Sequence, residues 1–247
     1  MYVIAHISDS HLDGGDRNAE RAARVIAYLA GLEQPVDVVL ITGDIADNGL
    51  PSEYEEALKA LGCSYPLLVC PGNHDRRGAF RRSLLGEVAE TDPAAPINMA
   101  RSVGGVTFAM CDSSIPGEHS GHLADETLAW LDGVLAATTE PSFVCFHHPP
   151  VTLQVPMIDT IRLHGEQRLA AVIERHPHVV ALLCGHAHTA AASTFAGRPL
   201  LIAPGLTSTI VLPWENDGFV DLEQPPGVAF HVLDEHARLT THFRVVL

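Results

Sequence analysis

The chain has 247 residues, with 15 Lys and Arg against 30 Asp and Glu and a formal net charge of -15. A chain of this length buries an ample core, and because its motifs must converge we expect one domain over residues 1–247. The negative charge repels phosphate backbones and argues against nucleic-acid binding over a broad face, although a small anionic ester can bind where metal charge dominates.

We expect no secretion signal at the amino terminus, because the first residues already read as a strand, and no uninterrupted apolar run approaches the roughly 20 residues that a membrane span requires. Five cysteines lie singly along the chain, without a Cys-x-x-Cys pair. An odd count of separate cysteines is typical of buried free thiols in a reducing compartment. We therefore expect a cytoplasmic protein that does not enter a membrane.

Strands and helices are predicted to alternate along the first three quarters of the chain. The runs 3–7 and 36–41 are predicted to be buried strands, and Val25 and Leu29 between them fall on one helical face. Pro51 marks the first turn of a second helix. Further strands are predicted at 66–70, 106–111, 143–146 and 179–184, and further helices at 76–85, near 125–135 and at 169–173.

Strand-like segments separated by Gly and Pro dominate from residue 190 onward. They lie at 193–195, 200–203, 210–212, 228–233 and 240–246. Alternating strands and helices followed mostly by strands predict an α/β protein with a β-rich carboxyl-terminal part, 190–247. The segment 152–165, which mixes apolar and polar residues, is predicted to be either a lid or an interface patch for self-association, and we expect a homodimer.

The chain contains five short polar motifs, and nearly all of them follow a predicted strand. They are Asp9-Ser10-His11, Gly43-Asp44, Gly72-Asn73-His74-Asp75, His147-His148-Pro149 and Gly185-His186-Ala187-His188. Ligands of α/β sheets sit outside the carboxyl ends of the strands, so the motifs can share one crevice. Carboxylate, amide and imidazole groups without thiolate suit Mn, Fe, Zn or Co, and a pair of such ions is the usual clamp for displacement at phosphorus.

The first two motifs offer carboxylates and an imidazole. Asp9 and His11 alternate with Ser10 on an extended segment, so both side chains point the same way and can hold one ion; the alternative is an ordinary polar strand end. A carboxylate at Asp44, after a buried run, is costly unless it is paired. Its two oxygens can bridge two ions, and the alternative is a turn or helix cap.

The motif 72–75 is more specific, because a turn glycine precedes an amide oxygen and an imidazole. Adjacent residues cannot easily face the same ion. Asn73 is therefore the predicted ligand, and His74 stays free to bind substrate or protonate a leaving oxygen. Asp75 is expected either to orient that imidazole or to cap the following helix.

Two histidine-rich motifs follow strands later in the chain. Of His147 and His148, only one is expected to reach the metals, and the alternative is an exposed pair in a turn. His186 and His188 repeat the alternation of the first motif after Gly185, which allows a sharp turn. Irregular geometry at that turn can send the two imidazoles to different ions.

Together the motifs from Asp9 to His188 resemble those of the calcineurin-like metallophosphoesterases. Weaker matches resemble the class III cyclic nucleotide phosphodiesterases and the bacterial glycerophosphodiesterase branch. These matches include the runs 42–49, 112–114 and 147–150. The resemblance implies an α/β fold of the metallo-dependent phosphatase-like kind, a four-layer αββα sandwich with a dinuclear metal site at the carboxyl ends of its strands.

The resemblance also implies a division of the ligands between two divalent or trivalent ions of Mn, Fe, Zn or Co. Asp9, His11 and His188 would hold the first ion, Asn73, His147 and His186 the second, and Asp44 would bridge them. His74 matches the histidine that acts as acid or stabilises the transition state in that family.

These residues predict a dinuclear metal-dependent phosphodiesterase. A metal-bridging hydroxide would attack a small phosphodiester in line, with 3',5'-cyclic nucleotides such as cAMP and glycerophosphodiesters as the leading substrates. Asp47, Asn48 and His122 are candidate substrate contacts, together with His119. The alternatives are a phosphomonoesterase or nuclease of the same superfamily, and a non-catalytic metal-site scaffold that binds proteins.

Overall fold

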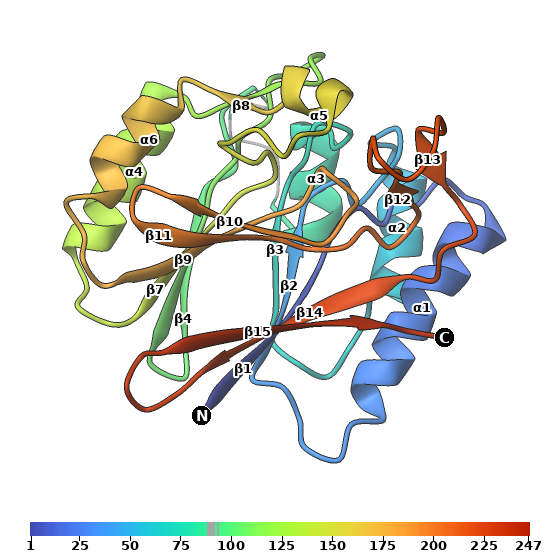
Figure 1. Cartoon of the computed structure of the whole chain (residues 1–247), viewed down its shortest axis with the longest axis horizontal. Helices are drawn as coiled ribbons and strands as arrows, with labels where there is room; N and C mark the ends of the chain where they lie inside the picture. Colours follow the sequence, from blue (N-terminus) through green and yellow to red (C-terminus); the bar gives the residue numbers. More distant parts are fainter. Residues whose placement is uncertain (88–91, 93) are drawn as a thin grey trace.

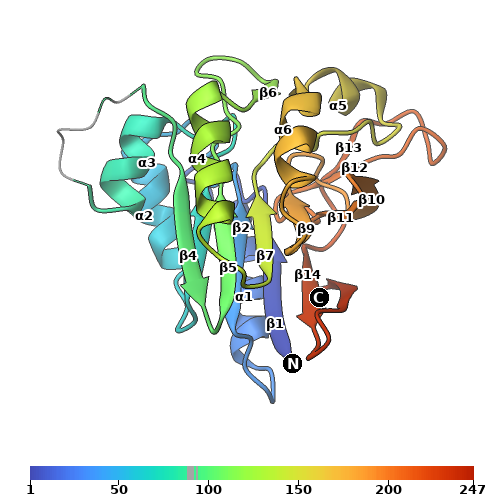
Figure 2. The same cartoon turned by 90° about the vertical axis from the view of Figure 1, so that its left-hand side faces the viewer.

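Two mixed β-sheets lie face to face in the computed structural model, which describes residues 1–87, 92 and 94–247 (Figure 1, Figure 2). The first has the order β15-β14-β1-β2-β3, with β1 (Tyr2–Ile7), β2 (Val38–Thr42), β3 (Leu67–Cys70), β14 (Gly227–Leu233) and β15 (Leu239–Val245). The second has the order β10-β11-β9-β7-β5-β4, with β4 (Met99–Val103), β5 (Val106–Met110), β7 (Ser142–Cys145), β9 (Val179–Cys184), β10 (Ala191–Phe195) and β11 (Arg198–Ile202).

The side chains of β2 alternate between two apolar cores. Val38 and Leu40 lie in the core between the sheets, where the second sheet contributes Phe108. Val39 and Ile41 lie in the core between the first sheet and its helices. Both faces of the strand are buried, which explains why its sequence is an uninterrupted apolar run.

Helices cover the outer face of each sheet (Figure 2). The first sheet packs against α1 (Asp16–Ala30), α2 (Pro51–Ala60) and α3 (Arg77–Leu84), and the second against α4 (Asp125–Ala136) and α6 (Glu166–Ile173). Val25 and Leu29 of α1 are fully buried, as the predicted helical face requires. The predicted four-layer αββα fold is confirmed.

Several short elements carry too little periodicity to be predicted. They are β6 (Gly121–His122), β8 (Leu163–His164), β13 (Val220–Asp221) and α5 (Pro156–Thr160). The predicted strand 210–212 is observed as the shorter strand β12 (Thr209–Ile210), which pairs with β13. The segment 152–165 holds α5 and β8, and β8 pairs in parallel with β6. Its role as lid or interface, the single domain and the homodimer stay predictions.

Parallel strands bring the polar motifs to one edge of the molecule. The strands β1, β2 and β3 are parallel, and so are β5, β7, β9 and β11. The two sheets meet there at Gly185, because a Cβ on this residue would overlap Ser8 and lie 2.8 Å from the carbonyl oxygen of Thr42. In the described part of the chain, no helix is long and apolar enough to cross a membrane.

Candidate metal centre

The backbone is strained where the polar motifs meet. Five residues without the freedom of glycine adopt left-handed conformations: Asp9 (φ 57°), His11 (φ 41°), Asp44 (φ 49°), His186 (φ 69°) and His188 (φ 51°). Such conformations are costly and persist where the surrounding structure enforces them, often at functional sites. All five belong to motifs that the sequence singles out.

One group of side chains brings together Asp9, His11 and His188. The Nε2 atoms of His11 and His188 are 3.2 Å apart, and Nε2 of His188 is 3.5 Å from Oδ1 of Asp9. Nε2 of His11 is also 3.5 Å from Oδ2 of Asp44. These atoms converge closely enough to hold one ion.

A second group lies on the other side of Asp44. Nε2 of His147 is 3.2 Å from Nδ1 of His186 and 3.2 Å from Oδ2 of Asp44. The same Asp44 oxygen therefore faces His11 in one group and His147 in the other. A carboxylate in this position can bridge two ions.

Two buried polar atoms support a cation at this place. Oδ1 of Asn73 and Nε2 of His186 are buried and make no hydrogen bond within the described residues. An amide oxygen without a donor is costly in a protein interior unless something else satisfies it. The donor set of oxygen and imidazole nitrogen fits Mn, Fe, Zn or Co.

Hydrogen bonds hold the imidazoles in position from behind. Nδ1 of His147 donates to the carbonyl oxygen of Thr42 at 2.7 Å, which leaves Nε2 with a lone pair toward Asp44 in the neutral ring. Nδ1 of His188 lies 2.7 Å from the hydroxyl of Ser208, and Nδ1 of His11 lies 3.0 Å from Oδ1 of Asp47. Such outer contacts fix ring orientation in metal sites.

The electrostatics of the site favour positive charge beside Asp44. Burial by itself raises the pKa of the Asp44 carboxyl, but His147, followed by His11 and His74, holds this pKa well below its usual range. Burial likewise opposes charge on His147, yet Asp44 outweighs it and raises the pKa of His147 to about 9. Burial lowers the pKa of His186 and so favours the neutral imidazole that binds metals.

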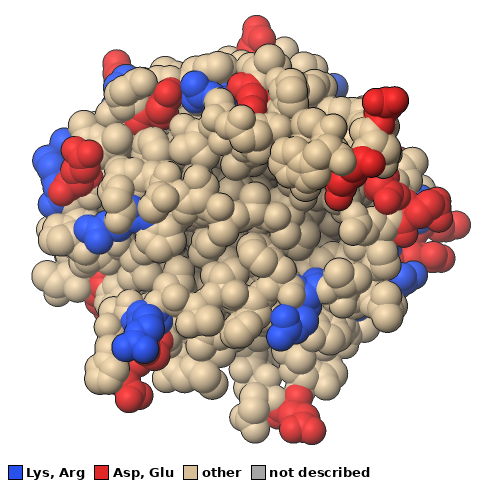
Figure 3. Space-filling view, in the orientation of Figure 1, with Lys and Arg blue, Asp and Glu red and all other residues tan. Residues whose placement is uncertain are grey.

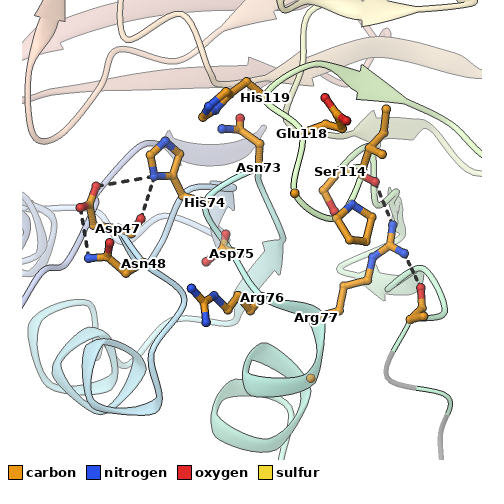
Figure 4. A pocket seen from close by; sticks show the side chains of 15 residues that line it. Asp47, Asn48, Asn73, His74, Asp75, Arg76, Arg77, Ser114, Glu118 and His119 are labelled. Atoms are coloured by element: carbon orange, nitrogen blue, oxygen red, sulfur yellow. Dashed lines mark hydrogen bonds and ion pairs between the residues drawn. The ribbon is translucent and has the colours of Figure 1, made fainter.

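His74 lies beside the two groups and faces an open cavity. Its backbone N–H donates to Oδ1 of Asp44 at 2.9 Å, and its Nδ1 donates to the carbonyl oxygen of Asp47 at 2.7 Å. Nε2 is therefore left to face a ligand. Figure 4 shows the ring at the cavity wall, with Asp47 on one side and His119 on the other.

Asp75 does neither of the two things expected from the sequence. Its carboxylate accepts hydrogen bonds from the backbone N–H groups of Gly72, Ile45 and Ala46, and from the hydroxyl of Tyr54. The cap residue of α3 is Arg76 instead. Asp75 therefore ties the loop after β2 to the loop after β3, which positions Asp44 and Asn73 together.

The cavity beside His74 has a volume of about 830 Å³. Asp47 and Asn48 line one wall, and His119 lines the opposite wall. His122 lies elsewhere: its Nε2 is 3.0 Å from Nη1 of Arg168, and it is not among the residues of the cavity wall. The structure thus brings three of the four candidate substrate contacts, Asp47, Asn48 and His119, to this cavity and places His122 outside it.

The sequence alone does not reveal the groups that orient the imidazoles. The carbonyl oxygen of Thr42 carries no side-chain signal, and Ser208 is an ordinary hydroxyl far along the chain from His188. The ion pair between Arg77 and Asp112, with Nε 2.7 Å from Oδ2, also has no local sequence signature. Only the tertiary structure brings these partners together.

Comparison with known proteins agrees with this geometry. Residues 2–190 match the family model described as calcineurin-like phosphoesterase. The chain belongs to the calcineurin-like phosphoesterase family. Members of this family use a dimetal centre, and the described residues offer four overlapping groups of His and Asp that could hold an ion.

Individual relatives match this chain over most of its length. The glycerophosphodiester phosphodiesterase GpdQ of Enterobacter lignolyticus is 33% identical over 242 residues, covering 93% of this chain and 86% of the relative. The 3',5'-cyclic adenosine monophosphate phosphodiesterase CpdA of Pseudomonas aeruginosa is 29% identical over 248 residues, covering 97% and 88%.

Solved structures share the fold of this phosphoesterase at low identity. A dimetal phosphatase from Danio rerio has a TM-score of 0.71 and 17% identity, covering 100% of this chain and 96% of its own. The purple acid phosphatase PPD1 from yellow lupin has a TM-score of 0.73 and 13% identity, covering 99% and 51%. Both similarities concern the fold alone.

Proposed function

We propose that this protein is a phosphodiesterase that uses two metal ions to hydrolyse small phosphodiesters, namely 3',5'-cyclic nucleotides or glycerophosphodiesters. The observation that carries the proposal is the position of Asp44 Oδ2, which lies 3.5 Å from Nε2 of His11 and 3.2 Å from Nε2 of His147. One carboxylate oxygen faces two separate ligand groups. The similarity to GpdQ, a glycerophosphodiester phosphodiesterase, and to CpdA, a cyclic adenosine monophosphate phosphodiesterase, supports a diester as substrate.

The proposed ligands follow the two groups. Asp9, His11 and His188 would hold one ion, Asn73, His147 and His186 the other, and Asp44 would contact both. When bound, two such ions would activate water and neutralise charge on phosphorus oxygens. The donors accept several first-row metals, so the identity of the bound ions would depend on metal supply.

His74 is the proposed catalytic residue. A carbonyl oxygen only accepts hydrogen bonds, so the contact with Asp47 places a hydrogen on Nδ1 of His74. The Asp47 carboxylate lies 3.6 Å from the same nitrogen and helps to orient the ring. When Nε2 also carries a hydrogen, it would donate this hydrogen to a phosphoryl oxygen or to the leaving alcohol.

The cavity supports a small diester over other esters. A volume of about 830 Å³ is within the range of small-molecule sites and gives room for the second ester arm that a monoester lacks. On the face shown in Figure 3, acidic side chains gather at the right-hand edge and no continuous basic stripe crosses the surface. This charge distribution does not suit a nucleic-acid track, and so argues against a nuclease.

Kinetics of the metal-loaded protein test the proposal with bis(p-nitrophenyl) phosphate. The wild type should hydrolyse it, and His74→Ala should lower kcat by about 100- to 10,000-fold while both ions remain bound. His236→Ala, which removes a histidine with a side chain 72% exposed, is the matched control. A wild type without diester hydrolysis would refute the proposal, and normal turnover in His74→Ala would remove this residue from its role.

A further inference from the structure

A third imidazole lies against the second ligand group. His148 is fully buried, its ring centroid is 4.5 Å from that of His186, and it can share an ion with His147 and His186 on distance alone. It is therefore a rival metal ligand that the two proposed groups do not use. Its hydrogen bonds decide between the possible roles.

Both ring nitrogens of His148 are engaged away from the ions. Nε2 is 3.1 Å from the carbonyl oxygen of His119, and a carbonyl only accepts, so Nε2 carries the hydrogen. Nδ1 lies 2.8 Å from the hydroxyl of Ser113, which donates to it in the neutral ring. Neither nitrogen has a lone pair left for a metal. Nε2 of His186, by contrast, has no partner among the described residues.

His119, which accepts the hydrogen bond from Nε2 of His148, belongs to a loop that forms one wall of the cavity, residues 112–122. Its base is fixed at Asp112, whose buried carboxylate accepts from Nε of Arg77 at 2.7 Å and from the backbone N–H of Ile97 at 2.9 Å. Its end is fixed where the N–H of His122 donates to the carbonyl of Ser113 at 2.9 Å. Both ends of the loop are therefore tied down.

The tip of the loop, residues 115–120, has few polar ties. The N–H of Glu118 donates to the carbonyl of Ile115 within the tip itself. Among the described residues, the contact from Nε2 of His148 to His119 is the one hydrogen bond that joins this tip to the rest of the protein. The ring of His148 also packs against Gly121, where a Cβ would lie 2.6 Å from Nδ1.

We propose that His148 is a positioning residue: its single Nε2–H holds the backbone of His119, and thereby keeps the His119 imidazole on the cavity wall opposite Asp47. The ring centroids of His119 and His74 are 6.3 Å apart, so this wall faces the proposed catalytic histidine. Loss of the contact widens the cavity rather than emptying the metal site. The effect on substrate rests on the proposed phosphodiesterase function.

Two conservative variants distinguish the roles of the two ring nitrogens of His148. In His148→Gln the side-chain amide can place an N–H where Nε2 lies, whereas the shorter amide in His148→Asn reaches only the position of Nδ1. We expect His148→Asn to raise KM for a diester about three- to tenfold, the loss of one hydrogen bond, with kcat little changed. His148→Gln should restore KM to near the wild-type value.

Two readouts do not depend on hydrolysis. Metal content should stay at the wild-type value in both variants, and amide hydrogen exchange in 115–120 should rise in His148→Asn but not in His148→Gln. In a His119→Ala background, His148→Asn should raise KM no further. These results would show that His148 acts through His119.

Other results would overturn the inference. Loss of bound metal in both variants would make His148 a ligand. An equal rise of amide hydrogen exchange in 115–120 in both variants would mean that the ring supports the fold by packing. Unchanged exchange in His148→Asn would mean that the hydrogen bond to His119 does not restrain the loop tip. A wild type inactive on every diester would refute the proposed function, whereas metal content and exchange would still decide the role of His148.

Discussion

Asp44 stands where two ligand groups meet, and Gly72 is the neighbour that leaves room for it. A Cβ on Gly72 would overlap Oδ1 of Asp44 and lie 2.5 Å from its backbone nitrogen. The backbone on both sides is held by Asp75, so neither group can move away cheaply. The conformation that presents the bridging carboxylate thus depends on a missing side chain.

This packing predicts opposite outcomes for two glycine substitutions. Gly72→Ala should reduce bound metal, diester turnover and the free energy of unfolding, because its Cβ displaces Asp44. Gly133→Ala, in the last turn of α4 with nothing within 4 Å of the new Cβ, should stabilise the protein by up to roughly 0.5–1 kcal/mol. Metal analysis and chemical denaturation measure both, and a Gly72→Ala protein with full metal content would contradict the assignment.

For single residues, the sequence identifies the candidate metal ligands better than it identifies their hydrogen-bond partners. The ligand motifs could be found because carboxylate, amide and imidazole groups follow apolar runs at short spacings. The behaviour of Asp75 could not, since its partners are backbone N–H groups of two loops. The position of His122 outside the cavity wall could not be predicted either, because its contact with Arg168 of α6 is tertiary.

At the scale of elements, a buried histidine pair links three strands of the first sheet. Nδ1 of His6 in β1 is 3.0 Å from Nε2 of His231 in β14, and Nε2 of His6 is 2.8 Å from the hydroxyl of Thr42 in β2. Both rings are fully buried. Burial lowers the pKa of His231 to about 3 and lowers the pKa of His6 as well, so both stay neutral in the folded protein.

The histidine pair predicts a loss of stability in acid. Below about pH 6.5 the unfolded chain protonates these rings while the folded chain does not, so the free energy of unfolding falls by up to about 1.4 kcal/mol per pH unit for each ring. In His231→Gln one of the two rings is gone, so the number of protons taken up on unfolding should fall by about one between pH 6 and 4.5. The slope of the free energy of unfolding against pH should decrease accordingly. Denaturation at several pH values measures it, and an unchanged slope in the variant would contradict the burial of a neutral His231.

Helices and strands could be predicted from the sequence where their burial leaves an apolar pattern. Both faces of β2 are buried, which gives an uninterrupted apolar run, and one face of α1 is buried, which gives a helical apolar period. The two-residue strands β6, β8 and β13 were not predicted, because each is formed by pairing with a distant segment rather than by its own pattern.

At the scale of the whole molecule, one apolar core joins both sheets. It contains Ile4 and Leu40 from the first sheet and Phe108, Phe143 and Leu183 from the second. Neither sheet can bury its inner face without the other. The layer order was predictable from the alternation of strands and helices together with the family resemblance, whereas the pairing of β14 with β1 required the structure.

This shared core predicts a single cooperative unfolding transition. Denaturation of the metal-free protein followed by far-UV circular dichroism and by tryptophan fluorescence should give coincident curves. Two separated transitions would contradict the prediction of one domain over residues 1–247.

The central claim, hydrolysis of a small phosphodiester, is tested most directly by comparing kcat/KM of the metal-reconstituted protein across four substrates: 3',5'-cAMP, 2',3'-cAMP, glycerophosphoethanolamine and a phosphomonoester. The account predicts that at least one diester has a higher kcat/KM than the monoester and that removal of the metal abolishes its hydrolysis. A preference for the monoester, or diester hydrolysis that persists without metal, would contradict it.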